Sequence, residues 1–243
     1  MYYAFLFSTI AGLSTLFGYF FIFFNNKGDR VVISSLSFAA GVMVCVSFVD
    51  LIPEGFIYFS SIFNGFPAII ILFIFFIIGI IVSDFFGKHM NSGEGELYRV
   101  GIVSMIVIVL HNIPEGIATF LSTQNNFKLG LSLSIAIAFH NIPEGISISV
   151  PIYYSTNSKI KAFFYVLISS LSEPFGAFIA FLFLHGFNNF IMGIFMGIIA
   201  GIMFYISFYE LLPSSYKYKS RGRMLFYFMI GFLFILITHF ILN

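Results

Sequence analysis

Residues 66–87, FPAIIILFIFFIIGIIVSDFFG, form an apolar run long enough to cross a bilayer, with Asp84 as their one charged residue. A transmembrane helix needs roughly 20 mostly apolar residues. Of the 243 residues in the chain, 60% are hydrophobic and 9% are charged, whereas a soluble domain has about 25% charged residues. Further span-like stretches lie at about 2–24, 31–52, 98–121, 128–151, 159–184, 188–213 and 222–242. The sequence therefore predicts an all-α, polytopic membrane bundle of eight transmembrane helices in one domain, residues 1–243.

The basic residues orient this bundle in the lipid bilayer. Ten of the eleven lysines and arginines fall in or beside the links 1–2, 3–4, 5–6 and 7–8, and only Lys128 falls on the other side. Basic loops remain cytoplasmic, so both termini are expected outside the plasma membrane, which is the inner membrane if the cell is Gram-negative. The net charge of +1 and the lack of a basic cluster argue against a nucleic-acid partner.

Two apolar spans carry similar sequences in opposite directions. Residues 41–53, GVMVCVSFVDLIP, resemble residues 201–213, GIMFYISFYELLP, and Asp50 matches Glu210. With eight spans, spans 2 and 7 cross the membrane in opposite directions. The similarity indicates an inverted repeat of spans 1–3 and 6–8, an arrangement that recurs in transporters with a site near the middle of the membrane.

A hexapeptide, HNIPEG, occurs twice, at residues 111–116 and 140–145, within spans 4 and 5. Positions i and i+4 share a helix face, so His111 lies with Glu115 and His140 lies with Glu144. Ionisable residues in hydrocarbon are costly and mark functional sites. Imidazole with carboxylate and amide oxygen suits a borderline divalent cation such as Zn²⁺. A hydrogen-bonded seam between two helices is the alternative, but it does not explain the acids.

A third acid, Glu173, lies in span 6 within SEPFGA, residues 172–177. Three buried carboxylates repel one another unless protons or a cation neutralise them. With eight spans, HNIPEG on spans 4 and 5 and SEPFGA on span 6, the whole chain resembles the ZIP (Zrt/Irt-like) family of divalent-metal transporters, in its short bacterial zinc-uptake type.

This resemblance implies two metal positions and a path to them. The first position would be formed by His111, Glu115, His140 and Glu144. The second would be formed by Asn112, Asn141 and Glu173 with the bridging Glu115 and Glu144, and Met43 would line the path from span 2. Two ions can then be bound, as transported substrate rather than as a catalytic cofactor.

The expected function is transport of divalent transition-metal ions into the cytoplasm, with zinc first and iron, manganese and cadmium as further candidates. The chain is expected not to be an enzyme. An intramembrane metal-dependent hydrolase and a proton or monovalent-cation pathway are the alternatives, and a homodimer is a candidate assembly.

Several polar residues lie nearer the span ends. Asp50 and Glu54, at the outer end of span 2, either collect cations at the entrance or form a solvated helix end. Glu210 is either an exit station or a solvated helix end. His185 and His239 are expected at the membrane interface, Asp84 at the inner end of span 3 and His89 in a loop.

Overall fold

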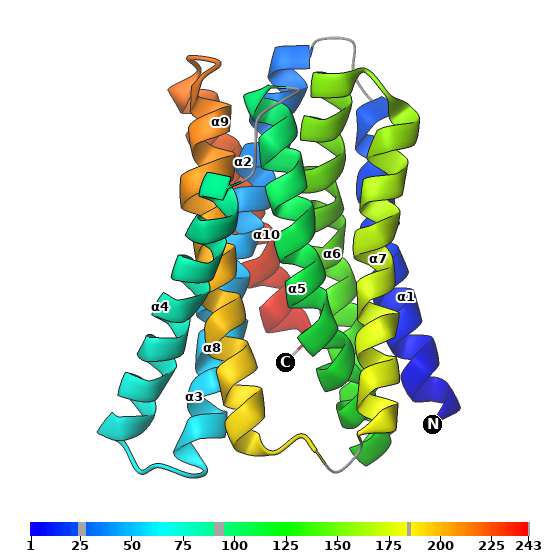
Figure 1. The fold of residues 1–243 in the computed structure, drawn as a ribbon, viewed down its shortest axis with the longest axis vertical. Coiled ribbons are helices and arrows are strands. Elements are labelled where there is room, and N and C mark those ends of the chain that lie inside the picture. The colour runs from blue at the N-terminus through cyan, green and yellow to red at the C-terminus, as the bar shows by residue number, and fades with distance from the viewer. Residues whose placement is uncertain (24–27, 90–94, 184–185, 243) are drawn as a thin grey trace.

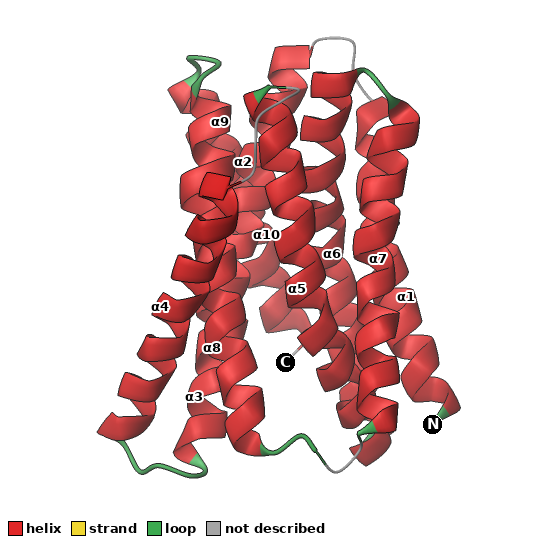
Figure 2. Ribbon diagram, viewed as in Figure 1, coloured by secondary structure: helices red, strands yellow, loops and turns green. Residues whose placement is uncertain are grey.

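The protein, described here from a computed structural model, is all-helical over the residues whose structure can be described, 1–23, 28–89, 95–183 and 186–242 (Figures 1 and 2). Within these ranges, eight helical segments have the length and hydropathy of membrane spans. The segments are Tyr2–Phe23, Gly28–Ser60, Phe66–His89, Glu96–Asn125, Phe127–Thr156, Lys159–Leu182, Asn189–Tyr216 and Arg221–Ile241. The predicted fold class and number of spans are confirmed.

Three of the eight spans are composite. The first joins α1 (Tyr2–Tyr19) to the short helix η1 (Phe20–Phe23); the second joins α2 (Gly28–Val46), the π-helix η2 (Ser47–Leu51) and α3 (Ile52–Ser60). The third to sixth are α4 (Phe66–His89), α5 (Glu96–Asn125), α6 (Phe127–Thr156) and α7 (Lys159–Leu182). The seventh joins α8 (Asn189–Tyr205), the π-helix η3 (Ile206–Leu211) and α9 (Leu212–Tyr216), and the last is α10 (Arg221–Leu242).

The second span is longer than its sequence predicts. It was expected to end near residue 52, but it continues through α3 to Ser60. Asp50 and Glu54, expected either to collect cations at the entrance or to form a solvated helix end, both line a cavity between the helices. Pro53 does not break the helix: it lies just after the π-helix η2, and the backbone is helical on both sides of it.

The helices pack in two groups. α1, α5, α6 and α7 contact one another, while α2 packs on α10 and α4 packs on α8 (Figure 1). α2 also contacts α6, and through this contact the two groups meet. Small residues allow such close approaches, because helices inside a membrane associate through van der Waals packing rather than through the hydrophobic effect.

Close helix contacts reproduce the inverted repeat. A Cβ added at Gly41 in α2 would lie 2.0 Å from the Phe228 carbonyl oxygen in α10, and one at Gly201 in α8 would lie 2.0 Å from the Phe76 carbonyl oxygen in α4. Positions 41 and 201 are the ones that match in the two similar sequences. The same contact therefore occurs twice, each time between one helix of the first half of the repeat and one helix of the second.

The two π-helices also occur at equivalent positions of the inverted repeat. η2 and η3 fall at matching positions, and in each the first serine of the motif donates its hydroxyl to a methionine carbonyl: Ser47 to Met43 and Ser207 to Met203, both at 2.8 Å. Single π-turns inside helices are frequent at functional sites. Both π-helices come just before the proline of the repeated sequence, Pro53 or Pro213.

Both chain ends lie at the same end of the bundle as the turn between α5 and α6, the lower end in Figure 1. The N-terminal amine is 3.4 Å from Gln124 Oε1 near the end of α5. The opposite end carries most of the described basic residues, including those between α9 and α10 and at the start of α10. Lys27 belongs to the same predicted basic set but lies outside the described residues. Which end faces the cytoplasm remains a prediction from these charges.

Candidate metal site

The two HNIPEG motifs face each other across the contact between α5 and α6. The histidine, asparagine and glutamate of both copies are buried, and so is Glu173 on α7. The residues of the predicted site therefore lie on three neighbouring helices of one group. Since these helices also pack on α1, the polar side chains are enclosed by protein rather than by lipid.

The first cluster joins the two histidines to the two motif glutamates. His111 Nε2 lies 3.1 Å from Glu144 Oε1 and 3.4 Å from Glu115 Oε1, and His140 Nε2 lies 3.1 Å from Glu115 Oε1. One donor atom from each of His111, His140 and Glu144 fits within 4.8 Å of the others. Nitrogen and oxygen donors at such spacing can converge on one zinc ion after small side-chain adjustments.

The second cluster lies beside the first and contains the asparagines and Glu173. Asn141 donates its amide to Glu173 Oε2 at 2.8 Å and to the Ala11 carbonyl at 2.9 Å. Asn112 can orient its amide nitrogen toward Glu144 Oε2 at 3.3 Å. The structure therefore brings together the seven His, Asn and Glu residues that the sequence and the resemblance singled out.

Several acceptor atoms in these clusters have no hydrogen-bond partner among the described residues. They share complete burial and a place at the α5–α6–α7 contact. They are Glu115 Oε2, Asn141 Oδ1, Glu173 Oε1 and His111 Nδ1, while Glu144 Oε1 has only its contact with His111 Nε2 at 3.1 Å. A buried polar atom without a partner is costly, and a buried carboxylate more so. A divalent cation would supply the missing positive charge and bind these lone pairs.

Two glycines let the backbones approach at this site. A Cβ at Gly116 would lie 1.9 Å from the Glu173 carbonyl oxygen, and one at Gly145 would lie 2.0 Å from the Thr15 carbonyl oxygen. Since Gly116 and Gly145 are the last residues of the two motifs, Thr15 on α1 is the repeat counterpart of Glu173 on α7. Its hydroxyl is buried and has no partner among the described residues.

Sequence reasoning missed Thr15, although a signal was available. Residues 13–18, LSTLFG, match residues 171–176, LSEPFG, at four of six positions, with Thr15 aligned to Glu173. This pairing extends the inverted repeat to spans 1 and 6. The site is therefore built on a symmetric frame but is itself asymmetric, with a carboxylate on one side and a hydroxyl on the other.

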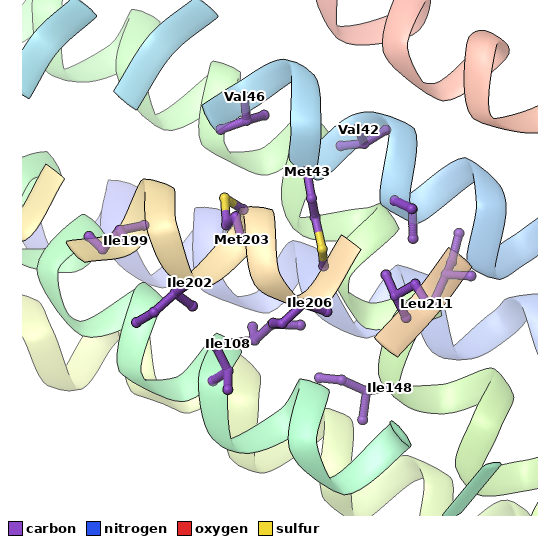
Figure 3. Packing of buried hydrophobic residues seen from close by; sticks show 14 of the residues in the cluster. Val42, Met43, Val46, Ile108, Ile148, Ile199, Ile202, Met203, Ile206 and Leu211 are labelled. Carbon is purple, nitrogen blue, oxygen red and sulfur yellow. The ribbon is translucent and has the colours of Figure 1, made fainter. Parts of the chain in front are cut away.

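Met43 lies in the apolar core rather than among these ligands. It is fully buried and packs with Ile206, Met203 and Ile108 where α2, α5 and the seventh span meet (Figure 3). Met203 is its match in the repeat. A place for Met43 on the metal path remains a prediction.

A cavity of about 410 Å³ leads from this site toward the end of the bundle that carries the termini. Glu115 and His140 line its deep part, and Asp50, Glu54 and His239 line it farther out. His239 Nδ1 lies 2.7 Å from Asp50 Oδ1. The histidine expected at the membrane interface is therefore paired inside the cavity, while His185 lies outside the described residues.

The opposite end of the bundle is closed by charged pairs. Arg99 of α5 donates to both carboxylate oxygens of Glu210 in η3, at 3.0 and 2.9 Å, and to the Gly87 carbonyl at 2.8 Å. Nearby, Lys217 pairs with Glu96. Glu210, considered from the sequence as an exit station or a solvated helix end, is thus buried and held in a bidentate ion pair.

The two remaining polar positions lie near this closure. Asp84 pairs with Lys88 at 2.5 Å and accepts from the Tyr205 hydroxyl at 3.4 Å, near the end of the third span that is predicted to be the inner one. His89 was expected in a loop but is the last residue of α4, with its ring 2.8 Å from the Phe85 carbonyl.

Comparison with known proteins agrees with this geometry. Residues 88–239 match the model of the family described as ZIP zinc transporter. The chain belongs to the ZIP zinc transporter family. Among curated proteins, this ZIP chain is 36% identical to zinc transporter ZupT of Clostridium perfringens, over 90% of this chain and 88% of the relative. It is 34% identical to zinc transporter ZupT of Streptococcus mutans, over 97% of this chain and 96% of the relative. It is 39% identical to zinc transporter ZupT of Chlorobium phaeovibrioides, over 91% of each chain.

Membership confirms the resemblance drawn from the motifs, and it identifies the chain as a membrane transporter of divalent metal rather than an enzyme. The relatives align along nearly the full chain, so the match includes both HNIPEG copies and Glu173.

Proposed function

We propose that this chain carries Zn²⁺ across the plasma membrane into the cytoplasm through the buried site on α5, α6 and α7. The observation that carries the proposal is the convergence of unpartnered carboxylate and imidazole atoms at the contact between the two motifs. The names of the relatives support zinc as the principal substrate. Fe²⁺, Mn²⁺ and Cd²⁺ are further candidates, because nitrogen and oxygen donors bind several first-row cations.

The two clusters support two ion positions within one transporter domain, residues 1–243. His111, Glu115, His140 and Glu144 would hold the first ion. The second would be held by Asn112, Asn141 and Glu173, with Glu115 and Glu144 bridging the two. Binding to deprotonated ligands displaces protons, so uptake depends on pH.

The open cavity at one end and the charged pairs at the opposite end support a direction of ion movement through the bundle. An ion reaches Glu115 and His140 from the side of the termini, which the positions of the basic residues place outside the cell. It leaves only when the Arg99–Glu210 pair separates. Alternating exposure of one buried site is the general behaviour of inverted-repeat transporters.

The outward faces of α4 and α10 carry many exposed apolar side chains. Lipid covers such faces in a membrane, and a second copy of the chain in a homodimer is the other candidate cover. Neither cover changes the site, because the site helices lie in the other group.

Zinc uptake into proteoliposomes tests the proposal. Glu144→Gln keeps the shape of the side chain and removes one charge from the site. It is expected to lower uptake at least about tenfold, since even residues behind metal ligands contribute 10- to 100-fold. Asp29→Asn, at an exposed acid at the start of α2, is the matched control. Equal uptake by both variants would move the path elsewhere. Lack of flux of any of the four metals through folded wild type would reject metal transport.

A further inference from the structure

Asp50 and Glu210 occupy matching positions in the inverted repeat but have different partners. Glu210 is held by Arg99, whose charge is permanent. Asp50 is held by His239 of α10, at 2.7 Å. An imidazole can be neutral and can bind a metal, and a guanidinium cannot. The repeat has therefore placed a carboxylate at both ends of the path. Only at the open end is its partner, His239, a side chain that can bind a metal ion.

The Asp50–His239 pair has the arrangement found behind metal-bound histidines. When Nδ1–H donates to Asp50, the neutral ring carries its lone pair on Nε2. Such carboxylate–histidine pairs fix the ring and raise its basicity as a metal ligand. The pair is also within reach of water, since its side chains are 27% and 36% exposed. As an ion pair alone, such a partly exposed contact adds little stability.

The surrounding cavity favours a cation. Glu54, one turn after Asp50, lines the same space, and at its deep end lies Glu115 with one buried oxygen that lacks a hydrogen-bond partner in the described structure. Among the described residues that line this cavity there is no lysine or arginine. Negative charge enclosed by low-dielectric walls concentrates cations.

We propose that His239, supported by Asp50 and joined by Glu54, forms an outer zinc-binding station, separate from the buried site. It takes the ion from water before the ion loses its remaining water at His140 and Glu115. The station deepens the proposed function, because it assigns the first binding step of the same path. A hydrated ion needs only one or two protein ligands at such a position, since water fills the rest of its coordination.

Equilibrium dialysis with ZnCl₂ tests the station on purified full-length protein. The background carries His111→Ala and Glu144→Ala, which dismantle the buried site. Residual zinc binding is expected there, and adding Asp50→Asn with His239→Gln should weaken it at least about tenfold. Asp29→Asn with His89→Gln removes an acid and a histidine outside the cavity and should leave it unchanged. Elution as a single folded species checks each variant.

Transport kinetics in the otherwise wild-type protein give a second readout. Asp50→Asn with His239→Gln should raise the KM for zinc about tenfold while the maximal rate stays within about twofold, the pattern of lost binding rather than lost transport steps. The station is rejected if the buried-site variant binds no zinc, or if its residual binding survives loss of Asp50 and His239. If wild type binds zinc at the station but moves none, the transport proposal fails and the station stands.

Discussion

Removal of Arg99 should open the closed end of the bundle. Arg99→Gln leaves the Glu210 carboxylate, whose side chain is 1% exposed, without its two hydrogen bonds of 2.9 and 3.0 Å. Loss of one partner of a buried ion pair costs about 3–5 kcal/mol. Because the arginine side chain is 22% exposed, solvent screening lowers this to about 2–3 kcal/mol. At about 1.4 kcal/mol per tenfold change, the equilibrium should shift roughly 30- to 140-fold toward the open form.

Alkylation of a cysteine at the closure measures this shift. Ser214→Cys places a thiol at a buried position beside Lys217 and Glu96, in a chain that also carries Cys45→Ser. If opening precedes reaction, the alkylation rate should rise in the same ratio when Arg99→Gln is added.

Two variants control for other causes. Arg30→Gln removes an exposed arginine at the same end and should leave the rate unchanged. Adding Glu210→Gln to Arg99→Gln leaves neither charge unpaired, and should recover part of the closure. If Arg99→Gln reacts no faster than Arg30→Gln in folded protein, the ion pair does not hold this end shut.

Three further outcomes follow from the site and its frame. Gly116→Ala would place a Cβ 1.9 Å from the Glu173 carbonyl oxygen, so the melting temperature should fall by several degrees. Gly222→Ala, whose added Cβ would have no atom within 4 Å, should leave the melting temperature unchanged. Lowering the pH from 7.5 to 5.5 should weaken zinc binding measured by dialysis, by up to about tenfold per pH unit for each proton displaced, because protons compete for the same lone pairs. Binding that is constant across this range would contradict ligation by histidine and carboxylate. Lys219→Cys in the Cys45→Ser chain should resist impermeant thiol reagents added to sealed cells, and ready labelling would reverse the orientation.

Local sequence predicted the spans and the ligands because each depends on neighbouring residues. Hydrocarbon requires about 20 apolar residues in a helix, and this requirement is visible at residues 66–87 without knowledge of the fold. The motif His111–Gly116 predicted its own ligand face, because i and i+4 positions meet on any helix. Because residues 111–116 and 140–145 have the same sequence, the pairing of the two copies could be predicted.

The predictions that were less accurate concern polar residues whose partners are distant in sequence. For Asp50 the sequence left a cation entrance and a solvated helix end open, because nothing within its own span shows that His239, 189 positions away, lies beside it. Glu210 was read as an exit station or a solvated helix end because Arg99 is equally remote. Thr15 carries no charge to attract notice, and the match of residues 13–18 with 171–176 gains its meaning from the packing of α1 on α6.

By itself, the sequence predicted eight membrane-spanning helices, which the structure confirms, and two matched histidine–glutamate sets as candidate metal ligands within them. Only the tertiary structure decided which carboxylates are left for a cation. Arg99 neutralises Glu210 at one end, while Glu115, Glu144 and Glu173 retain unpartnered oxygens or only histidine contacts. The reason is physical: the charge state of a buried acid depends on what lies within a few ångströms of it in space, and in a helical bundle most of those neighbours come from other helices.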